Sequence, residues 1–212
     1  MDSDQFNEAY FERGVETEVS LYQNYRWIPD MTIPMVMTMI DYLHIERGAK
    51  VLDFGCAKGY VVKAFNLLYR NAWGVDISRY AISKAESSCF LKEGNVVLDT
   101  PPQFPESFDY CIAKDVFEHI ENIQLHNELK WIREIAKVLF VIVPLGNGVH
   151  YNCPIMHRDV THIHKCSYNW WEHTFMDTGW EVVYRSYRID GMKDSYYNYP
   201  KAHGFFTLTR KR

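Results

Sequence analysis

The stretch VLDFGCAKGY, residues 51–60, begins with apolar residues, continues through an acid and ends in a glycine-rich turn. A short apolar run that stops at a glycine is typical of a buried strand in a parallel sheet. The turn after such a strand directs backbone N–H groups and the start of the next helix toward a ligand. The stretch therefore predicts a cofactor-binding turn, and the rest of the chain must indicate which cofactor it suits.

Two nucleotide-binding patterns fit this turn poorly. A triphosphate-binding loop needs Gly-x-x-x-x-Gly-Lys-Ser/Thr, but here Lys58 precedes Gly59 and Tyr60 follows it. A dinucleotide fingerprint needs Gly-x-Gly-x-x-Gly. Counted from Gly55, its second and third glycines would be Ala57 and Tyr60. The first pattern is excluded, and the second is disfavoured because a tyrosine replaces the glycine that lets helix and strand pack closely.

Apolar runs and helical periodicities alternate along the chain. Strands are expected at residues 51–54, 72–76, 95–98, 108–113, 138–143, 181–188 and 205–209, with helices between them and Ser78 as a helix N-cap. This alternation predicts an α/β fold with a seven-stranded, mostly parallel sheet and helices on both faces. The two late strands are close together, which predicts an antiparallel hairpin at the sheet edge.

Length and composition suit a single globular domain of 212 residues. We expect an N-terminal helical cap at 1–48, a cofactor-binding half at 49–146 and a substrate-side half at 147–212. The net charge is −4, and no basic cluster exceeds residues 210–212, which disfavours nucleic acid as a partner. Five cysteines without a CxxC pair indicate reduced thiols. No signal peptide or transmembrane run is visible, so we expect a cytoplasmic protein without a membrane partner.

The pattern acid-x-Gly-x-x-x-Gly, formed by Asp53, Gly55 and Gly59, is followed by further motifs along the chain. Asp76 ends the second expected strand in GVDIS. The segments FPESFDYCIAKDVFEHI (104–120), KVLFVIVPLG (137–146) and HTFMDTGWEVV (173–183) follow in order. Together they resemble the class I S-adenosylmethionine-dependent methyltransferases over about residues 48–209. This resemblance implies a Rossmann-like fold and S-adenosyl-L-methionine as cofactor, with S-adenosyl-L-homocysteine as product.

The resemblance also implies roles for individual residues. Gly55 and Gly59 let the backbone approach the methionine part of the cofactor, and Asp53 orders that loop. Asp76 holds the ribose hydroxyls, and Ile77 packs on the adenine. The other implied cofactor contacts are Cys56, Asp99, Thr100, Lys114, Tyr25 and Arg26. Two alternatives stay open: Asp53 and Asp76 serve only turn chemistry at strand ends, and Arg26 is a surface arginine rather than a partner of the cofactor carboxylate.

Methyl transfer from a sulfonium needs no acid, because the leaving group is neutral. A hydroxyl acceptor benefits from a general base, most often histidine. His119 resembles the second residue of a Glu-His pair common in the family, where it is either structural or a proton acceptor. The sequence HRDVTHIHKC, residues 157–166, offers His162 as a second catalytic candidate. The predicted substrate-binding residues are Tyr22, Asp115, His164 and Tyr168.

The histidines and cysteines of this segment do not predict a metal site, because HxxxxHxHxC lacks the paired short spacings of zinc sites. The sequence predicts methyl transfer to a hydroxyl or amine of a small molecule, such as a sugar or a natural-product intermediate. Two alternatives remain: a non-catalytic S-adenosylmethionine-binding module and a nicotinamide-dependent oxidoreductase.

Overall fold

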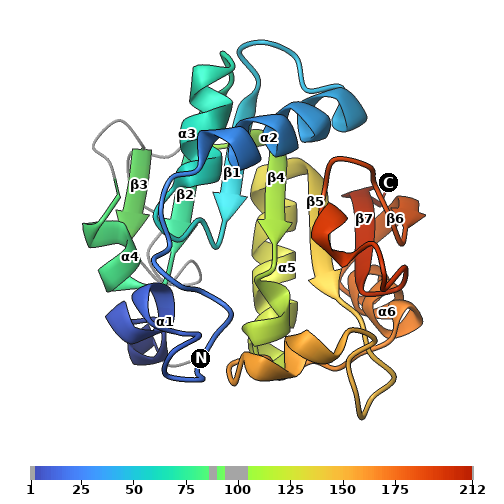
Figure 1. Ribbon diagram of the computed structural model, residues 1–212. Helices are drawn as coiled ribbons and strands as arrows, with labels where there is room; N and C mark the ends of the chain where they lie inside the picture. The colour runs from blue at the N-terminus through green and yellow to red at the C-terminus, as the bar shows by residue number, and fades with distance from the viewer. Residues whose placement is uncertain (1–2, 86–89, 94–104, 212) are drawn as a thin grey trace.

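The computed structural model describes residues 3–85, 90–93 and 105–211. Its centre is a seven-stranded sheet with the strand order β3-β2-β1-β4-β5-β7-β6 (Figure 1). The strands are β1 (Lys50–Phe54), β2 (Asn71–Asp76), β3 (Phe90–Glu93), β4 (Phe108–Lys114), β5 (Ala136–Pro144), β6 (Trp180–Ser186) and β7 (His203–Arg210). The predicted α/β fold with a mostly parallel sheet is confirmed.

The strand direction changes at the edge of the sheet that the C-terminal strands form. Strands β1 to β5 pair in parallel, whereas β7 pairs antiparallel to both β5 and β6. The predicted antiparallel pair is therefore present, with β7 inserted between β5 and the edge strand β6. On the other side, β1 lies between β2 and β4, so the strand order reverses there. In open α/β sheets this reversal opens a crevice at the carboxyl ends of the strands, where ligands bind.

The third strand lies earlier in the chain than the sequence predicts. Phe90–Glu93 pairs with β2 in register from Trp73 to Asp76. The stretch expected to form this strand, residues 95–98, lies outside the described residues. The pairing of β3 still extends the sheet beyond β2, as a seven-stranded sheet requires.

Helices cover both faces of the sheet, as predicted. They are α1 (Glu8–Glu12), α2 (Pro29–Leu43), α3 (Tyr60–Leu67), α4 (Arg79–Ser83), α5 (Asn122–Ile135) and α6 (Tyr168–Asp177). Short 3₁₀ helices are η1 (Ser3–Gln5), η2 (Phe117–His119), η3 (Pro154–Arg158) and η4 (Asp194–Tyr196). The predicted N-cap of α4 is confirmed, because the Ser78 side chain accepts a hydrogen bond from the backbone N–H of Ala81.

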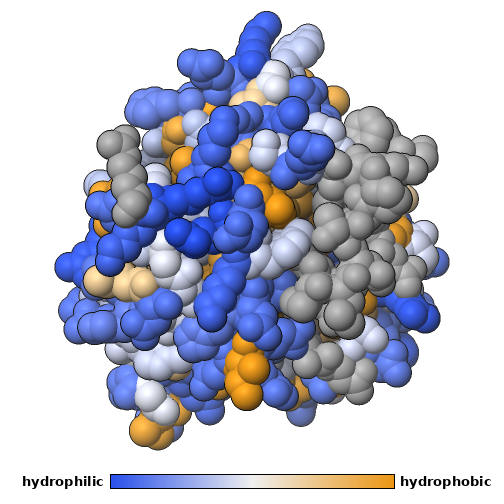
Figure 2. Space-filling model, turned by 180° about the vertical axis from the view of Figure 1, so that it is seen from behind, coloured by the Kyte–Doolittle hydropathy of each residue, from blue (hydrophilic) through white to orange (hydrophobic). Residues whose placement is uncertain are grey.

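Alternating side chains of the central strands divide the core into two layers. In β5, Leu139, Val141 and Val143 pack with α5 and α6, whereas Phe140 and Ile142 pack with α2 and α3. This period of two follows from the pleat of a strand that is buried on both faces. The view from behind shows a mostly hydrophilic surface outside its grey parts, with apolar side chains in separate spots (Figure 2).

The N-terminal segment reaches both ends of the strands. Helix α2 packs against α3, and α1 contacts α4 near the carboxyl ends of the strands (Figure 1). None of the helices within the described residues has the length and apolar character needed to cross a bilayer. The four cysteines in the described ranges are free thiols: Cys56, Cys111, Cys153 and Cys166.

Candidate active site

The turn between β1 and α3 has the backbone geometry that its glycines permit. Gly55 has φ = +78° and Gly59 has φ = +76°. A residue with a Cβ adopts such a left-handed backbone only at a cost in free energy. A Cβ on Gly55 would also lie 2.2 Å from Cγ2 of Val116, beyond the end of β4. The side chain of Val116 therefore occupies the space that a side chain at position 55 would need.

Asp76, at the end of β2, is bonded to the glycine turn. Its Oδ2 accepts a hydrogen bond from the backbone N–H of Ala57 at 2.7 Å, and its Oδ1 accepts one from Ser78 at 2.7 Å. Burial raises the pKa of Asp76, while these two backbone N–H groups lower it. Each carboxylate oxygen keeps a further lone pair, and Asp76 and Ile77 both line the main pocket.

Asp53 is the second-to-last residue of the strand β1 and lies deeper than Asp76. Its side chain is buried, and burial raises its pKa to about 7, against the opposing effect of Lys114. Asp53 does not line the pocket. Cys56 is buried as well, and its backbone N–H donates to the carbonyl of Val75. Both residues support the turn from behind.

The main pocket lies at the reversal of strand order. It contains about 700 Å³ of empty space, part of it open to solvent. The sheet contributes the glycine turn, Asp76, and the segment after β4 from Asp115 to Ile120. The N-terminal segment contributes an aromatic wall, which consists of Phe6, Tyr10, Phe11 and Tyr22.

Asp115, directly after β4, is another acidic residue that lines this pocket. It adopts a left-handed backbone with φ = +56°, a strained conformation for a residue other than glycine. Lys114 Nζ donates to its Oδ2 at 2.7 Å, and Lys193 Nζ donates to the same atom. Burial alone would raise the pKa of Asp115, but Lys114 and Lys193 outweigh it and hold the pKa well below its usual range. Asp115 is therefore an anion flanked by two cations.

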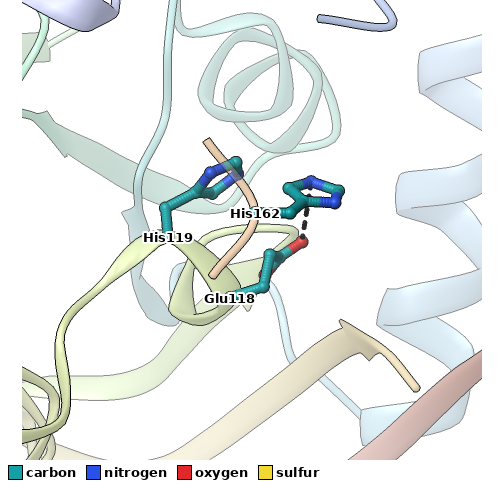
Figure 3. A group of neighbouring side chains, drawn as sticks. All are labelled: Glu118, His119 and His162. Atoms are coloured by element: carbon teal, nitrogen blue, oxygen red, sulfur yellow. Dashed lines mark ion pairs between the residues drawn. The ribbon is translucent and has the colours of Figure 1, made fainter. Parts of the chain in front are cut away.

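Glu118, His119 and His162 form a group next to the pocket, and His119 lines the pocket itself (Figure 3). Nε2 of His162 lies 3.9 Å from Oε1 of Glu118, and the two histidine rings are 4.8 Å apart between centroids. Burial lowers the pKa of His119 to about 4 and also lowers that of His162. Both imidazoles are therefore neutral near pH 7.

A polar network supports these histidines from behind. Asp159 Oδ1 accepts a hydrogen bond from the Thr161 hydroxyl at 2.5 Å, and Asp159 Oδ2 accepts one from Tyr10 at 2.9 Å. Thr161 Oγ1 lies 2.8 Å from Nδ1 of His119. The N-terminal segment, the loop after β5 and the residue pair after β4 are thus joined in one network.

Two of the predicted substrate-binding residues lie away from the pocket. His164 is buried, and its ring nitrogen Nε2 lies 2.6 Å from the carbonyl oxygen of Ile120, beside the rings of Trp170 and Trp171. Tyr168 is packed against Phe206 in the core. Neither residue lines the pocket, and both make the contacts of structural side chains.

Of the predicted site residues in the N-terminal segment, one lines the pocket and two do not. Tyr22 lines the pocket, whereas Tyr25 packs on the ring of Tyr22 with a centroid distance of 4.8 Å. Arg26 is exposed and does not line the pocket. Asp99 and Thr100 lie outside the described residues.

Two lysines near the pocket have no signal in the sequence. Lys58 of the glycine turn pairs with Glu12 and donates to the carbonyl of Tyr25 at 2.6 Å, which fastens the N-terminal segment to the cofactor turn. Lys193 comes from the connection between β6 and β7. Only the fold brings these lysines to the site, because their partners are far away in the sequence.

These features fit S-adenosylmethionine. The left-handed turn offers backbone close to the ligand, Asp76 offers free carboxylate lone pairs at the pocket wall, and aromatic rings cover the cavity. Ala57 in the turn has φ = +49° and carries a Cβ at the position of the second fingerprint glycine, which disfavours a dinucleotide.

Comparisons with known proteins agree with this geometry. A family of methyltransferase domains matches residues 35–185. Phosphoethanolamine N-methyltransferase 1 of Triticum aestivum is 29% identical over 111 residues, which are 47% of this chain and 22% of the wheat protein. The chain thus spans about a fifth of that relative's length.

Solved structures share the fold. The chain from the complex of the Haloferax volcanii Trm112 methyltransferase activator with a methyltransferase superposes with a TM-score of 0.66 at 16% identity, covering 87% of this chain and 92% of the other. An S-adenosylmethionine-dependent methyltransferase of Archaeoglobus fulgidus gives 0.63 at 15% identity, covering 86% and 97%. The family match favours S-adenosylmethionine over the nicotinamide alternative. The chain belongs to the methyltransferase-domain family, and S-adenosylmethionine is the cofactor that this family implies.

Proposed function

We propose that this enzyme methylates a hydroxyl or amine of a small molecule in the cytoplasm. The observation that carries the proposal is that a single pocket is lined by the cofactor turn and Asp76 and also by Asp115 and His119. Methyl transfer is an in-line displacement, so donor and acceptor must share one water-poor cavity. The bound cofactor supplies the electrophilic methyl group.

Different residues bind the cofactor, exclude water and accept the proton in this reaction. Gly55 and Asp76 bind the cofactor, and Tyr22 and the other rings of the N-terminal wall exclude water from the pocket. From the half beyond residue 147, His162 packs on His119 and Lys193 donates to Asp115, and these two partners line the pocket. The group of His119, His162 and Glu118 is where the acceptor loses its proton.

Charge and similarity support a small polar acceptor. The carboxylates of Asp115, Asp159 and Glu118 lie near Tyr22, and burial followed by these charges raises its pKa far above the usual value. An acidic pocket of this kind suits an amine or a polyol better than a phosphate-rich polymer. The wheat relative is named as a phosphoethanolamine N-methyltransferase.

The test is a screen for transfer of radiolabelled methyl groups from S-adenosylmethionine to sugar nucleotides, small amines and phenols. We expect transfer to one of these classes, and loss of transfer in Asp76→Ala at limiting cofactor. Methylation of nucleic acid or protein instead, with no small molecule accepted, would overturn the proposal.

A further inference from the structure

Three side chains next to the pocket bring metal-binding atoms into one small volume (Figure 3). One ring nitrogen each of His119 and His162 and one carboxylate oxygen of Glu118 all lie within 4.8 Å of one another. Bonds from nitrogen or oxygen to a transition metal are about 2.0–2.2 Å long. Small side-chain rotations would therefore bring all three atoms to a single ion.

Within the described part of the chain, the carboxyl group of Glu118 lacks hydrogen-bond partners. Its side chain is fully buried, and neither carboxylate oxygen has a hydrogen-bond partner among the described residues. A buried carboxylate without such partners is costly unless a cation or a proton compensates it. The nearest ionisable side chain is the neutral imidazole of His162, whose Nε2 is 3.9 Å from Oε1.

The surrounding hydrogen bonds assign the tautomers of both histidines. The Thr161 hydroxyl gives its one proton to Asp159, so it accepts from Nδ1 of His119. Nδ1 of His162 lies 3.1 Å from the carbonyl oxygen of Met156, which only accepts. Both rings are therefore protonated at Nδ1 and carry a free lone pair at Nε2. Metal-binding histidines are held by outer partners in this same way.

We propose that Glu118, His119 and His162 bind one divalent transition-metal ion of the Mn²⁺, Co²⁺ and Zn²⁺ class. Two imidazoles and one carboxylate suit these ions better than Mg²⁺ or Ca²⁺, which take oxygen ligands. The ligands come from two segments that are distant in the sequence, η2 and the loop after β5. The spacing of histidines and cysteines within residues 157–166 could not predict this ligand set, because Glu118 and His119 lie outside that segment.

Three protein ligands leave coordination positions open for the methyl acceptor. A hydroxyl bound there has a lowered pKa and loses its proton to solvent water. Its oxygen lone pair then forms the bond to the methyl carbon, and the electrons of the carbon–sulfur bond pass to sulfur, leaving a neutral thioether. This use of the ion rests on the proposed function and selects a hydroxyl acceptor over an amine.

The test is a metal titration of the full chain. Protein freed of metal by dialysis against EDTA is titrated with MnCl₂, CoCl₂ and ZnCl₂ by calorimetry, with Co²⁺ also followed by its visible absorption. We expect one ion per chain. Glu118→Gln and His162→Ala should each weaken binding by about 100-fold or more, and Thr161→Val by about 10–100-fold through the orientation of His119.

His150 provides the matched control. It is exposed, and its ring lies 5.6 Å from that of His157, so this pair could hold an ion adventitiously. His150→Ala should leave the affinity unchanged. Circular dichroism and titration with S-adenosylhomocysteine establish that each variant is folded. Binding lost in His150→Ala, or unchanged in Glu118→Gln and His162→Ala, or absent in the wild type, would overturn the proposal.

The titration needs neither acceptor nor methyl donor, so a failed acceptor screen leaves the metal site standing. Conversely, full methyl transfer by metal-free protein in EDTA would remove the ion from catalysis and leave the proposed function intact.

Discussion

The carboxylate of Asp76 accepts a hydrogen bond from the backbone N–H of Ala57, which ties the end of β2 to the glycine turn after β1. The same carboxylate lines the pocket. One residue therefore both shapes the turn and offers lone pairs to a ligand.

Asp76→Ala should weaken S-adenosylmethionine binding by about 1–3 kcal/mol, because the ribose hydroxyls and the Ala57 N–H would both lose a partner. Calorimetric titration measures the affinity. The exposed Asp41, near the end of α2, provides the control Asp41→Ala. Equal affinities in the wild type and Asp76→Ala would contradict the ribose role.

Gly55→Ala should destabilise the protein and abolish cofactor binding, and Gly48→Ala separates the two causes. Both glycines have φ = +78°, but a Cβ at Gly48 meets nothing within 4 Å, whereas one at Gly55 meets Val116. The left-handed strain costs roughly 1–2 kcal/mol at either site, and overpacking adds about 1–3 kcal/mol at Gly55 alone. Urea unfolding measures the difference. Equal losses would show that the contact with Val116 is unimportant, and Val116→Ala should partly rescue Gly55→Ala.

Lys58→Met should loosen the N-terminal segment. Lys58 is nearly buried and pairs with Glu12 and the carbonyl of Tyr25. The substitution removes the cation that joins these two groups. We expect faster backbone hydrogen exchange across residues 8–28 and weaker cofactor binding, since this segment covers the pocket. Lys130→Met, on the exposed side of α5, is the control. Unchanged exchange would mean that aromatic packing alone holds the segment.

Glu128 should make stability fall as pH rises. Burial raises its pKa to about 7 in the folded state, above the ordinary value of 4.5, so the folded protein binds more protons between these pH values. The free-energy cost of burying the ionised Glu128 carboxylate is absent below pH 4.5 and fully present above about pH 7. Glu128→Gln should therefore raise the free energy of unfolding at pH 8 by about 1–3 kcal/mol and change it little at pH 4. Urea unfolding at both pH values tests this, and a gain of equal size at pH 4 would contradict the assignment.

Much of the fold could be predicted because strand periodicity and turn residues are local signals. The apolar run before Gly55 and the acid at Asp76 both lie where their strands end. The strand Phe90–Glu93 was not predicted, because it has only four residues and is defined by its pairing with β2. Local patterns cannot specify such a pairing.

The site was harder to predict than the fold. His119 and Asp115 follow β4 directly, so the carboxyl-end rule predicts their place at the pocket. His164 and His162 have the same chemistry and nearly the same position in sequence, yet one lies against tryptophans and the other against Glu118. Lys193 reaches Asp115 from a connection that no motif marks. Such juxtapositions depend on tertiary packing, which a single sequence does not display.

The insertion of β7 between β5 and β6 has a consequence for synthesis of the chain. Strands β1 to β5 form pairs without any later segment, but β6 has its only strand partner in β7 within the described sheet. On a ribosome, the edge of β5 and the whole of β6 would stay unpaired until residues 203–210 emerge. Exposed strand edges of this kind invite pairing with other chains. The interval before the last strand emerges is thus when a nascent chain of this protein depends most on chaperones.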